Sequence, residues 1–320
     1  MARLRHLAAA LAALAAFTTP AWAAWPEDKP IEVVVGFAPG GGTDLMARRL
    51  LPFVQKRLGG KAQFVVVNKP GASGELSNAY VAKAQPDGYT LGIVNVPAFL
   101  YLPMARKTQY QVEDFQLVAR LVDDPTILIA RSEAKVDSLQ MMLGIAKQTP
   151  GALAVGHNGE GSNGELVLQL LRAATGVELS GVPYKGTGPQ KIDVLGGHLP
   201  MGTVSAGEVP ELHKGGRGPI KAVVQFTAKR SAALPDVPTA TESGVKVLMS
   251  SERGLAAPKG VPAAIVKRLE TAIADSLKDP EFLAAAAADA PVIAFLPGAQ
   301  WSKSLEQNSA ALKQMASTRK

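Results

Sequence analysis

A glycine loop between an apolar run and a helical stripe is the feature of this sequence best suited to chemistry. Val33-Val34-Val35 is a β-branched run typical of a buried strand, and Gly40, Gly41, Gly42, Thr43 and Asp44 follow it. Thr43 is placed to cap the next helix, with Asp44 in its first turn. A strand that leads through glycines into a helix turns backbone N–H groups and the positive end of the helix dipole toward one point. The loop therefore predicts an anion site.

The residues after this loop exclude one kind of anion site and predict the helix that follows. No Lys-Ser/Thr pair follows the glycines, so the loop is not a nucleoside-triphosphate P-loop. Apolar residues then recur at the spacing of an amphipathic helix. They are Ala47, Leu50, Leu51, Val54 and Leu58.

A second glycine loop spans Gly156–Gly164 and contains a literal G-x-G-x-x-G at Gly159, Gly161 and Gly164. A dinucleotide site is the obvious alternative, and it fails on two counts. The expected strand ends near Gly156, too early for the first motif glycine to make the tight turn, and residues 182–186 offer no acid for a ribose. The better interpretation is a second anion loop, with Ser162 at the N-terminus of the next helix.

An enzyme is the competing interpretation of the same residues. His157 could act as a base, but the nearby serines are not in a G-x-S-x-G elbow, so a Ser-His-Asp triad has no anchor. Lys185 and Thr187 could supply a cation and a hydroxyl, or could belong to a solvated loop. An exported α/β hydrolase-type enzyme acting on a small carboxylate therefore stays open, although no nucleophile–base–orienter set can be assembled.

The elements that must position these loops alternate along the chain. Strands expected at 33–35, 63–67 and 89–94, with helices between them, give the βαβαβ rhythm of a parallel, doubly wound sheet. Residues 95–103 are expected to be a loop. The pattern restarts after Asp123-Asp124-Pro125 and returns near residues 245–257. We expect two α/β domains, residues 24–122 with 251–320 and residues 123–250, around a cleft hinged near 123–126 and 245–254.

The first residues indicate export. Arg3, Arg5 and His6 form a basic n-region, residues 7–17 an Ala/Leu h-region too short to span a bilayer, and Ala21-Trp22-Ala23 a small-x-small cleavage site. Residues 1–23 are thus expected to be a signal peptide cleaved after Ala23, which places the mature protein in the periplasm.

Composition excludes several classes of function. The 320 residues carry a net charge of +7, two units of which belong to the expected signal peptide, and the charge is spread out with few aromatics, so nucleic acid is not an expected partner. The chain has no cysteine and four histidines, which argues against a metal site. We expect no cofactor and a monomer.

The motifs, in their order, resemble the periplasmic solute receptors of tripartite tricarboxylate transporters. They are VGFAPGGGTD, NKPGASG, AKAQPDGYTL, VPYKGTGP with VLGG, AKRSAALPDVPTATESG and GLAAPKGVP. The resemblance covers essentially the whole mature chain. It implies a fold like that of type II periplasmic binding proteins, a small mono- or dicarboxylate ligand and membrane permease subunits as partners. A ligand sensor for a signalling partner would share the fold.

The site implied by the resemblance and by the glycine loops falls on a defined set. The expected ligand-binding residues are Phe37, Gly41, Gly42, Thr43, Asp44, Ala72, Ser73, Gly74, Asn158, Gly159, Gly161, Ser162, Val204, Ser205 and Arg253.

The chain departs from the family pattern at three places. Val204 and Ser205 stand where many members carry a polar pair, Glu252-Arg253 replaces a common aromatic pair, and residues 96–99 are unusually apolar. If Arg253 faces the cleft, its guanidinium would hold a second anionic group of the ligand and favour a dicarboxylate. The alternative is a solvated Glu252–Arg253 pair outside the cleft, since only one of two neighbours on an extended segment can point inward.

Overall fold

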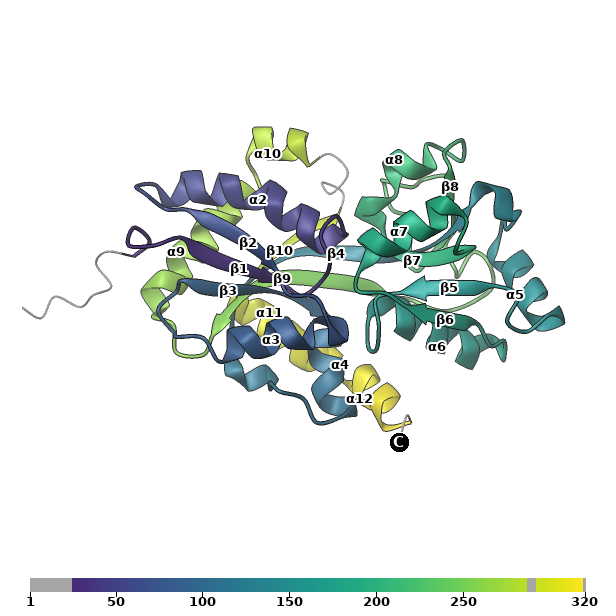
Figure 1. Cartoon of the computed structure of the whole chain (residues 1–320), viewed down its shortest axis with the longest axis horizontal. Helices are drawn as coiled ribbons and strands as arrows, with labels where there is room; N and C mark the ends of the chain where they lie inside the picture. The colour runs from purple at the N-terminus through teal and green to yellow at the C-terminus, as the bar shows by residue number, and fades with distance from the viewer. Residues whose placement is uncertain (1–24, 287–291, 319–320) are drawn as a thin grey trace, which may run out of the picture.

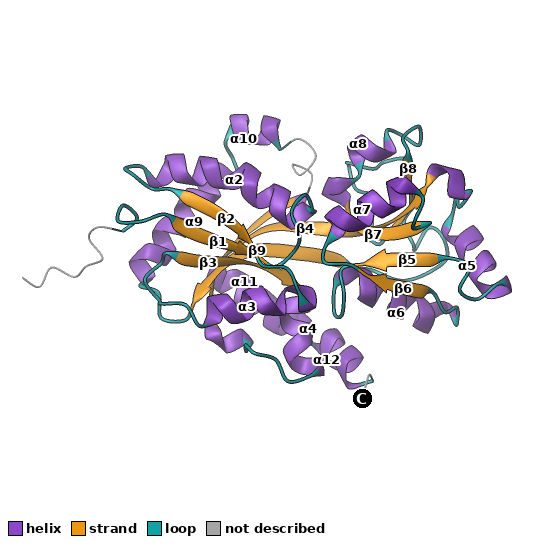
Figure 2. Ribbon diagram, in the orientation of Figure 1, coloured by secondary structure: helices purple, strands orange, loops and turns teal. Residues whose placement is uncertain are grey.

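One mixed sheet runs through the whole molecule in the computed structural model, which describes residues 25–286 and 292–318 (Figures 1 and 2). The expected signal peptide, residues 1–23, lies outside the described residues. The strand order is β2-β1-β3-β9-β4-β7-β5-β6, and β8 and β10 also pair with β4. The strands are β1 (Ile31–Val35), β2 (Phe64–Asn68), β3 (Thr90–Val96), β4 (Phe115–Arg131), β5 (Ala154–His157), β6 (Ser180–Pro183), β7 (Met201–Ser205), β8 (Ile220–Gln225), β9 (Ser250–Pro258) and β10 (Ile293–Pro297).

Helices cover both faces of this sheet in two lobes that lie side by side (Figure 1). Lobe 1 contains β1–β3, the first half of β4, β9 and β10, and lobe 2 contains the second half of β4 and β5–β8. The helices of lobe 1 are α2 (Gly42–Leu58), α3 (Glu75–Ala82), α4 (Ala98–Ala105), α9 (Ala263–Ser276), α10 (Pro280–Ala285), α11 (Gly298–Asn308) and α12 (Ala310–Ser317). Those of lobe 2 are α5 (Leu139–Gln148), α6 (Asn163–Thr175), α7 (Thr187–Gly196) and α8 (Pro210–His213). No helix within the described residues is long and apolar enough to span a membrane.

The predicted βαβαβ unit is confirmed by the strand register. Val34 of β1 lies opposite Val67 of β2 and Gly92 of β3, and both pairings are parallel. The sheet is not parallel throughout, however, because β9 runs antiparallel to both β3 and β4. The returning chain thus closes lobe 1 with a reversed strand, which the sequence pattern alone does not specify.

The expected crossing at Asp123-Asp124-Pro125 is the middle of a single strand. β4 pairs with β9 as far as Pro125 and with β7 from Thr126 onward, so its partners change where one lobe ends and the other begins. Pro125 has no N–H to give to a ladder, and it lies at this change of partners. β9 starts beside the same point and forms the second connection.

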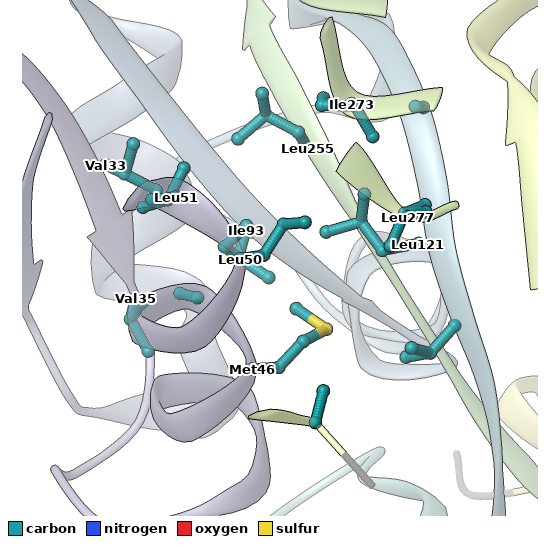
Figure 3. Close-up of a cluster of buried hydrophobic side chains, with 14 of the residues drawn as sticks. Val33, Val35, Met46, Leu50, Leu51, Ile93, Leu121, Leu255, Ile273 and Leu277 are labelled. Atoms are coloured by element: carbon teal, nitrogen blue, oxygen red, sulfur yellow. The ribbon is translucent and has the colours of Figure 1, made fainter. Parts of the chain in front are cut away.

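The main core of lobe 1 fixes the first glycine loop in place. Figure 3 shows Val33 and Val35 of β1 with Met46, Leu50 and Leu51 of α2, all buried. The predicted stripe of α2 therefore packs on the sheet, since Ala47 and Val54 are buried as well. A second core lies in lobe 2 and holds β5 and α6. Each glycine loop is thus anchored at both ends by buried apolar side chains.

The prediction of a loop at residues 95–103 is wrong. β3 continues to Val96 and α4 starts at Ala98. Pro97 stands at the N-cap of α4, where no helical N–H is required. Pro103 lies inside the helix and leaves the carbonyl of Phe99 without its usual partner. The Tyr110 hydroxyl donates to that carbonyl at 2.9 Å, which compensates the missing bond.

Candidate ligand-binding site

A narrow pocket lies between the lobes, where α2 and α4 of lobe 1 and α6 and α7 of lobe 2 begin. Helix dipoles that converge in this way make the pocket attractive to anions. The space open to the centre of a water molecule is only about 20 Å³, so the lobes are closed on each other. The lining residues are Phe37, Gly41, Gly42, Thr43, Asn95, Val96, Pro97, Ala98, Asn158, Ser162, Asn163, Thr187, Ser205, Glu208, Ser251 and Arg253.

The glycines before α2 allow the opposite lobe to come close. A Cβ added to Gly41 would lie 2.9 Å from the Thr187 hydroxyl oxygen, and one added to Gly42 would lie 2.9 Å from the Glu208 carboxylate. Both neighbours belong to lobe 2. The loop therefore needs glycine because side chains from the other lobe occupy the space.

Thr43 and Asp44 have other roles than expected. The N-cap of α2 is Gly41, so the prediction that Thr43 caps the helix is wrong; its hydroxyl faces the pocket and accepts from Asn95 Nδ2 at 2.8 Å. Asp44 does not line the pocket. Its carboxylate accepts from the Gly40 N–H at 3.0 Å and from Arg48 Nε at 2.9 Å, which braces the loop from behind.

The second glycine loop brings Ser162 and Asn158 to the pocket. The prediction that Ser162 caps the helix is confirmed, because its hydroxyl accepts from the Glu165 N–H at 3.3 Å and donates to the Gly159 carbonyl at 2.7 Å. Gly159 and Gly161 do not line the pocket. Their φ angles of 92° and 67° show that they shape the turn, which is a task glycine performs without strain.

Arg253 points into the pocket, and the alternative of a solvated pair with Glu252 is wrong. It is 4 % exposed, its Nη1 lies 3.1 Å from Asp124 Oδ2, and its Nη2 donates to the Ser205 hydroxyl. Its Nε has no hydrogen-bond partner among the described residues. Glu252 faces the opposite side of β9 and pairs with Arg120 at 3.1 Å. Asp124 is a buried counter-charge that sequence reasoning missed.

Glu208 is the second charged residue of the pocket that sequence reasoning missed. Its Oε1 accepts from the Gly42 N–H at 3.0 Å, from the Thr187 hydroxyl at 2.6 Å and from Lys191 Nζ at 3.0 Å. Burial by itself would raise the pKa of Glu208, but the charges of Lys191 and Arg253 and the hydrogen bonds from Thr187 and Lys191 hold it below its usual range. A Ser-x-x-Glu capping box, Ser205 to Glu208, was visible in the sequence as a signal for this turn.

The expected site residues divide into two groups. Those that line the pocket are Phe37, Gly41, Gly42, Thr43, Asn158, Ser162, Ser205 and Arg253. Those that do not are Asp44, Ala72, Ser73, Gly74, Gly159, Gly161 and Val204. Ala72 and Ser73 line a separate, more open pocket beside Arg106, while Val204 is in the core because Ser205, its neighbour on β7, faces the pocket.

Direct contacts between the lobes surround the pocket. The Ala38 N–H donates to the Lys185 carbonyl at 2.8 Å, and the Ser73 hydroxyl donates to the Asn158 carbonyl at 3.3 Å. Arg106 Nε lies 3.0 Å from a Glu160 carboxylate oxygen. Any ligand that reaches the pocket must therefore enter before these contacts form.

Comparison with known proteins identifies the family. The description "Tripartite tricarboxylate transporter family receptor" matches residues 46–315. The chain belongs to this family. Its members are solute-binding proteins, and the solved structures that it resembles include a periplasmic transporter and the periplasmic binding protein BugD.

One relative in sequence and two solved structures show how similar the chain is to known proteins. Protein BugT of Bordetella pertussis is 33% identical over 300 residues, 92% of this chain and 91% of BugT. A Rhodopseudomonas palustris protein solved with adipate has a TM-score of 0.82 at 30% identity, over 92% of this chain and 98% of that one. MatC from Rhodopseudomonas palustris, solved with malate, has a TM-score of 0.74 at 31% identity, over 79% and 86%.

Proposed function

We propose that this protein is a periplasmic receptor that captures a small organic carboxylate between its lobes and delivers it to the permease subunits of a membrane transporter. The observation that carries the proposal is Arg253. A buried charged donor without an acceptor is costly, and the buried Nε of Arg253 has no partner among the described residues, while Arg253 itself lines a pocket toward which helix N-termini converge. A ligand carboxylate would supply the missing acceptor.

The pocket offers this carboxylate a set of polar partners. Arg253 Nε would donate a charge-assisted hydrogen bond, and Thr43 of lobe 1 and Ser162 of lobe 2 also line the pocket. Buried side-chain oxygens of Asn95 and Asn158 also lack partners among the described residues. A hydroxyl of the ligand or a bridging water would satisfy them.

Two relatives support a carboxylate as the ligand class. The neighbours solved with malate and adipate carry different carboxylates on this fold. The enzyme alternative loses support, because His157, its candidate base, does not line the pocket; its Nδ1 accepts from the Gly159 N–H at 3.2 Å.

The remaining parts of the proposal concern export and closure. We propose cleavage after Ala23, a monomer, and domains formed by residues 24–122 with 251–320 and by residues 123–250. The change of partners along β4 supports hinges near 123–126 and 245–254. Intact-mass analysis of the periplasmic fraction should give a mature chain that starts at Ala24; retention of residues 1–23 would overturn this part.

A ligand screen tests the main proposal. The mature protein is heated with a panel of mono- and dicarboxylates, and with nucleotides as the contrasting class. At least one carboxylate should raise the melting temperature, since a ligand at a hundredfold its Kd adds about 2.7 kcal/mol to the free energy of unfolding. A shift with nucleotides alone would show that the glycine loops were misinterpreted.

A further inference from the structure

The N-terminus of α2 is already occupied by an anion that belongs to the protein. Glu208, carried by lobe 2, places its carboxylate against the Gly42 N–H of lobe 1. The Thr187 hydroxyl and the Lys191 ammonium complete its surroundings at 2.6 and 3.0 Å. These are the kinds of donor that a ligand carboxylate would use: a backbone N–H at a helix N-terminus, a hydroxyl and a cation.

The position is full in steric terms as well. A Cβ on Gly42 would lie 2.9 Å from the Glu208 carboxylate and 3.1 Å from Arg253 Nη1, so these two side chains already occupy the space directly in front of Gly42. The side chain of Glu208 is 3% exposed. The anion site that the glycine loop predicts is therefore real as a geometry, but its occupant is Glu208.

The ion pairs around the pocket lead to the same result. Arg253 pairs with Asp124 at 3.1 Å, and Lys191 pairs with Glu208 at 3.0 Å. Among the described residues, Arg253 Nε is the charged donor of this pocket that stays without a partner. One ligand carboxylate can accept a hydrogen bond from this Nε, whereas a second one close by would face the negative charge of Glu208 with no unpartnered charged donor of the pocket left among the described residues.

We propose that Glu208 is a specificity-determining residue that limits the ligand to one carboxylate within this pocket. The inference rests on the proposed function and names its substrate class: small carboxylates whose remaining end is uncharged. It replaces the hypothesis that Arg253 in the cleft favours a dicarboxylate. That hypothesis placed the first ligand carboxylate on the glycine loop, where the structure has the carboxylate of Glu208.

The test compares matched ligands in the wild type and in Glu208→Gln. Butyrate and succinate differ in one carboxylate, as do 2-hydroxybutyrate and malate, and isothermal titration calorimetry gives the Kd for each. Glutamine keeps the size and an acceptor for the Gly42 N–H while removing the negative charge. The wild type should bind the monocarboxylate of a pair about tenfold or more tighter, which is at least 1.4 kcal/mol. Glu208→Gln should lose most of this ratio by binding the dicarboxylate tighter.

Glu160→Gln is the matched control. Glu160 also belongs to lobe 2 and forms an ion pair across the cleft with Arg106, but it does not line the pocket. Weaker closure in this variant should raise the Kd for both ligands of a pair by a similar factor and leave the ratio of the two Kd values as in the wild type. Melting temperatures of both variants without ligand show whether the fold is intact.

The possible outcomes separate this inference from the proposed function. A wild type that binds succinate tighter than butyrate, and malate tighter than 2-hydroxybutyrate, overturns the role of Glu208 and leaves carboxylate binding in place. Dicarboxylate affinity that is unchanged or weaker in Glu208→Gln also overturns it. If no carboxylate binds to either protein, the proposed function fails and the inference fails with it.

Discussion

Replacing Arg253 by methionine should damage stability and ligand binding for two different physical reasons. Arg253 and Asp124 form a buried ion pair, with side chains 5% and 1% exposed and 3.1 Å between Nη1 and Oδ2. Removing Arg253 takes the opposite charge away from the buried Asp124 carboxylate, which costs about 3–5 kcal/mol of the free energy of unfolding. At about 2–4 °C per kcal/mol, the melting temperature should fall by roughly 6–20 °C.

A double variant separates the two effects. Asp124→Asn removes the buried negative charge and keeps an oxygen for the Gly207 N–H, which donates to Asp124 Oδ1 at 3.2 Å. Arg253→Met/Asp124→Asn should therefore regain most of the lost stability. It should not regain affinity, because the charge-assisted hydrogen bond to the ligand is still missing, a loss of about 1.5–3 kcal/mol or roughly 10- to 150-fold in Kd.

Thermal unfolding and calorimetric titration with the best monocarboxylate measure both quantities. Arg230→Met is the control, since Arg230 pairs with Glu242 at 2.9 Å on the surface and such pairs contribute about 0–1 kcal/mol. If the wild type and Arg253→Met are equally stable, the claim that Arg253 stabilises the buried Asp124 carboxylate is refuted. A double variant that binds ligand as tightly as the wild type would remove Arg253 from the site.

Three further predictions concern closure, capping and pH. Gly188→Ala places a Cβ 2.5 Å from a backbone oxygen of lobe 1 and should weaken ligand binding and enlarge the radius of gyration in X-ray scattering, whereas Gly144→Ala, with no atom within 4 Å of its Cβ, should change neither. Ser162→Ala removes the N-cap of α6 and should lower the free energy of unfolding by about 1 kcal/mol in urea titrations. Because the folded state lowers the pKa of Glu208, its ionised form stabilises the protein fully above about pH 4.3, and this contribution is lost as the pH falls through the folded pKa. The difference in unfolding free energy between wild type and Glu208→Gln should therefore shrink as the pH is lowered from about 5 to 3, and a constant difference would contradict the assignment.

The sequence by itself determined the parts of the molecule that local signals specify. The β-branched run at Val33–Val35, the helical stripe through Leu50 and the N-cap at Ser162 all appear where spacing predicts them, because each depends on neighbours within a few residues. The prediction of a loop at residues 95–103 is wrong because this segment depends on contacts with residues far away in the sequence. Tertiary contacts bury this apolar segment as α4, and they supply a hydroxyl for the Phe99 carbonyl that Pro103 leaves without its helical partner.

The tertiary structure alone decided which charges meet in the pocket. The carboxylate of Glu208 reaches a backbone N–H 166 residues away in the sequence, and Asp124 meets Arg253 from another strand of the sheet. No local spacing encodes these distances. The strand register decides that Arg253 rather than Glu252 points inward, and lobe closure decides that the glycine loop faces an anion of the protein itself. A glycine loop thus indicates that something comes close to the backbone, but only the packing of the two lobes identifies it.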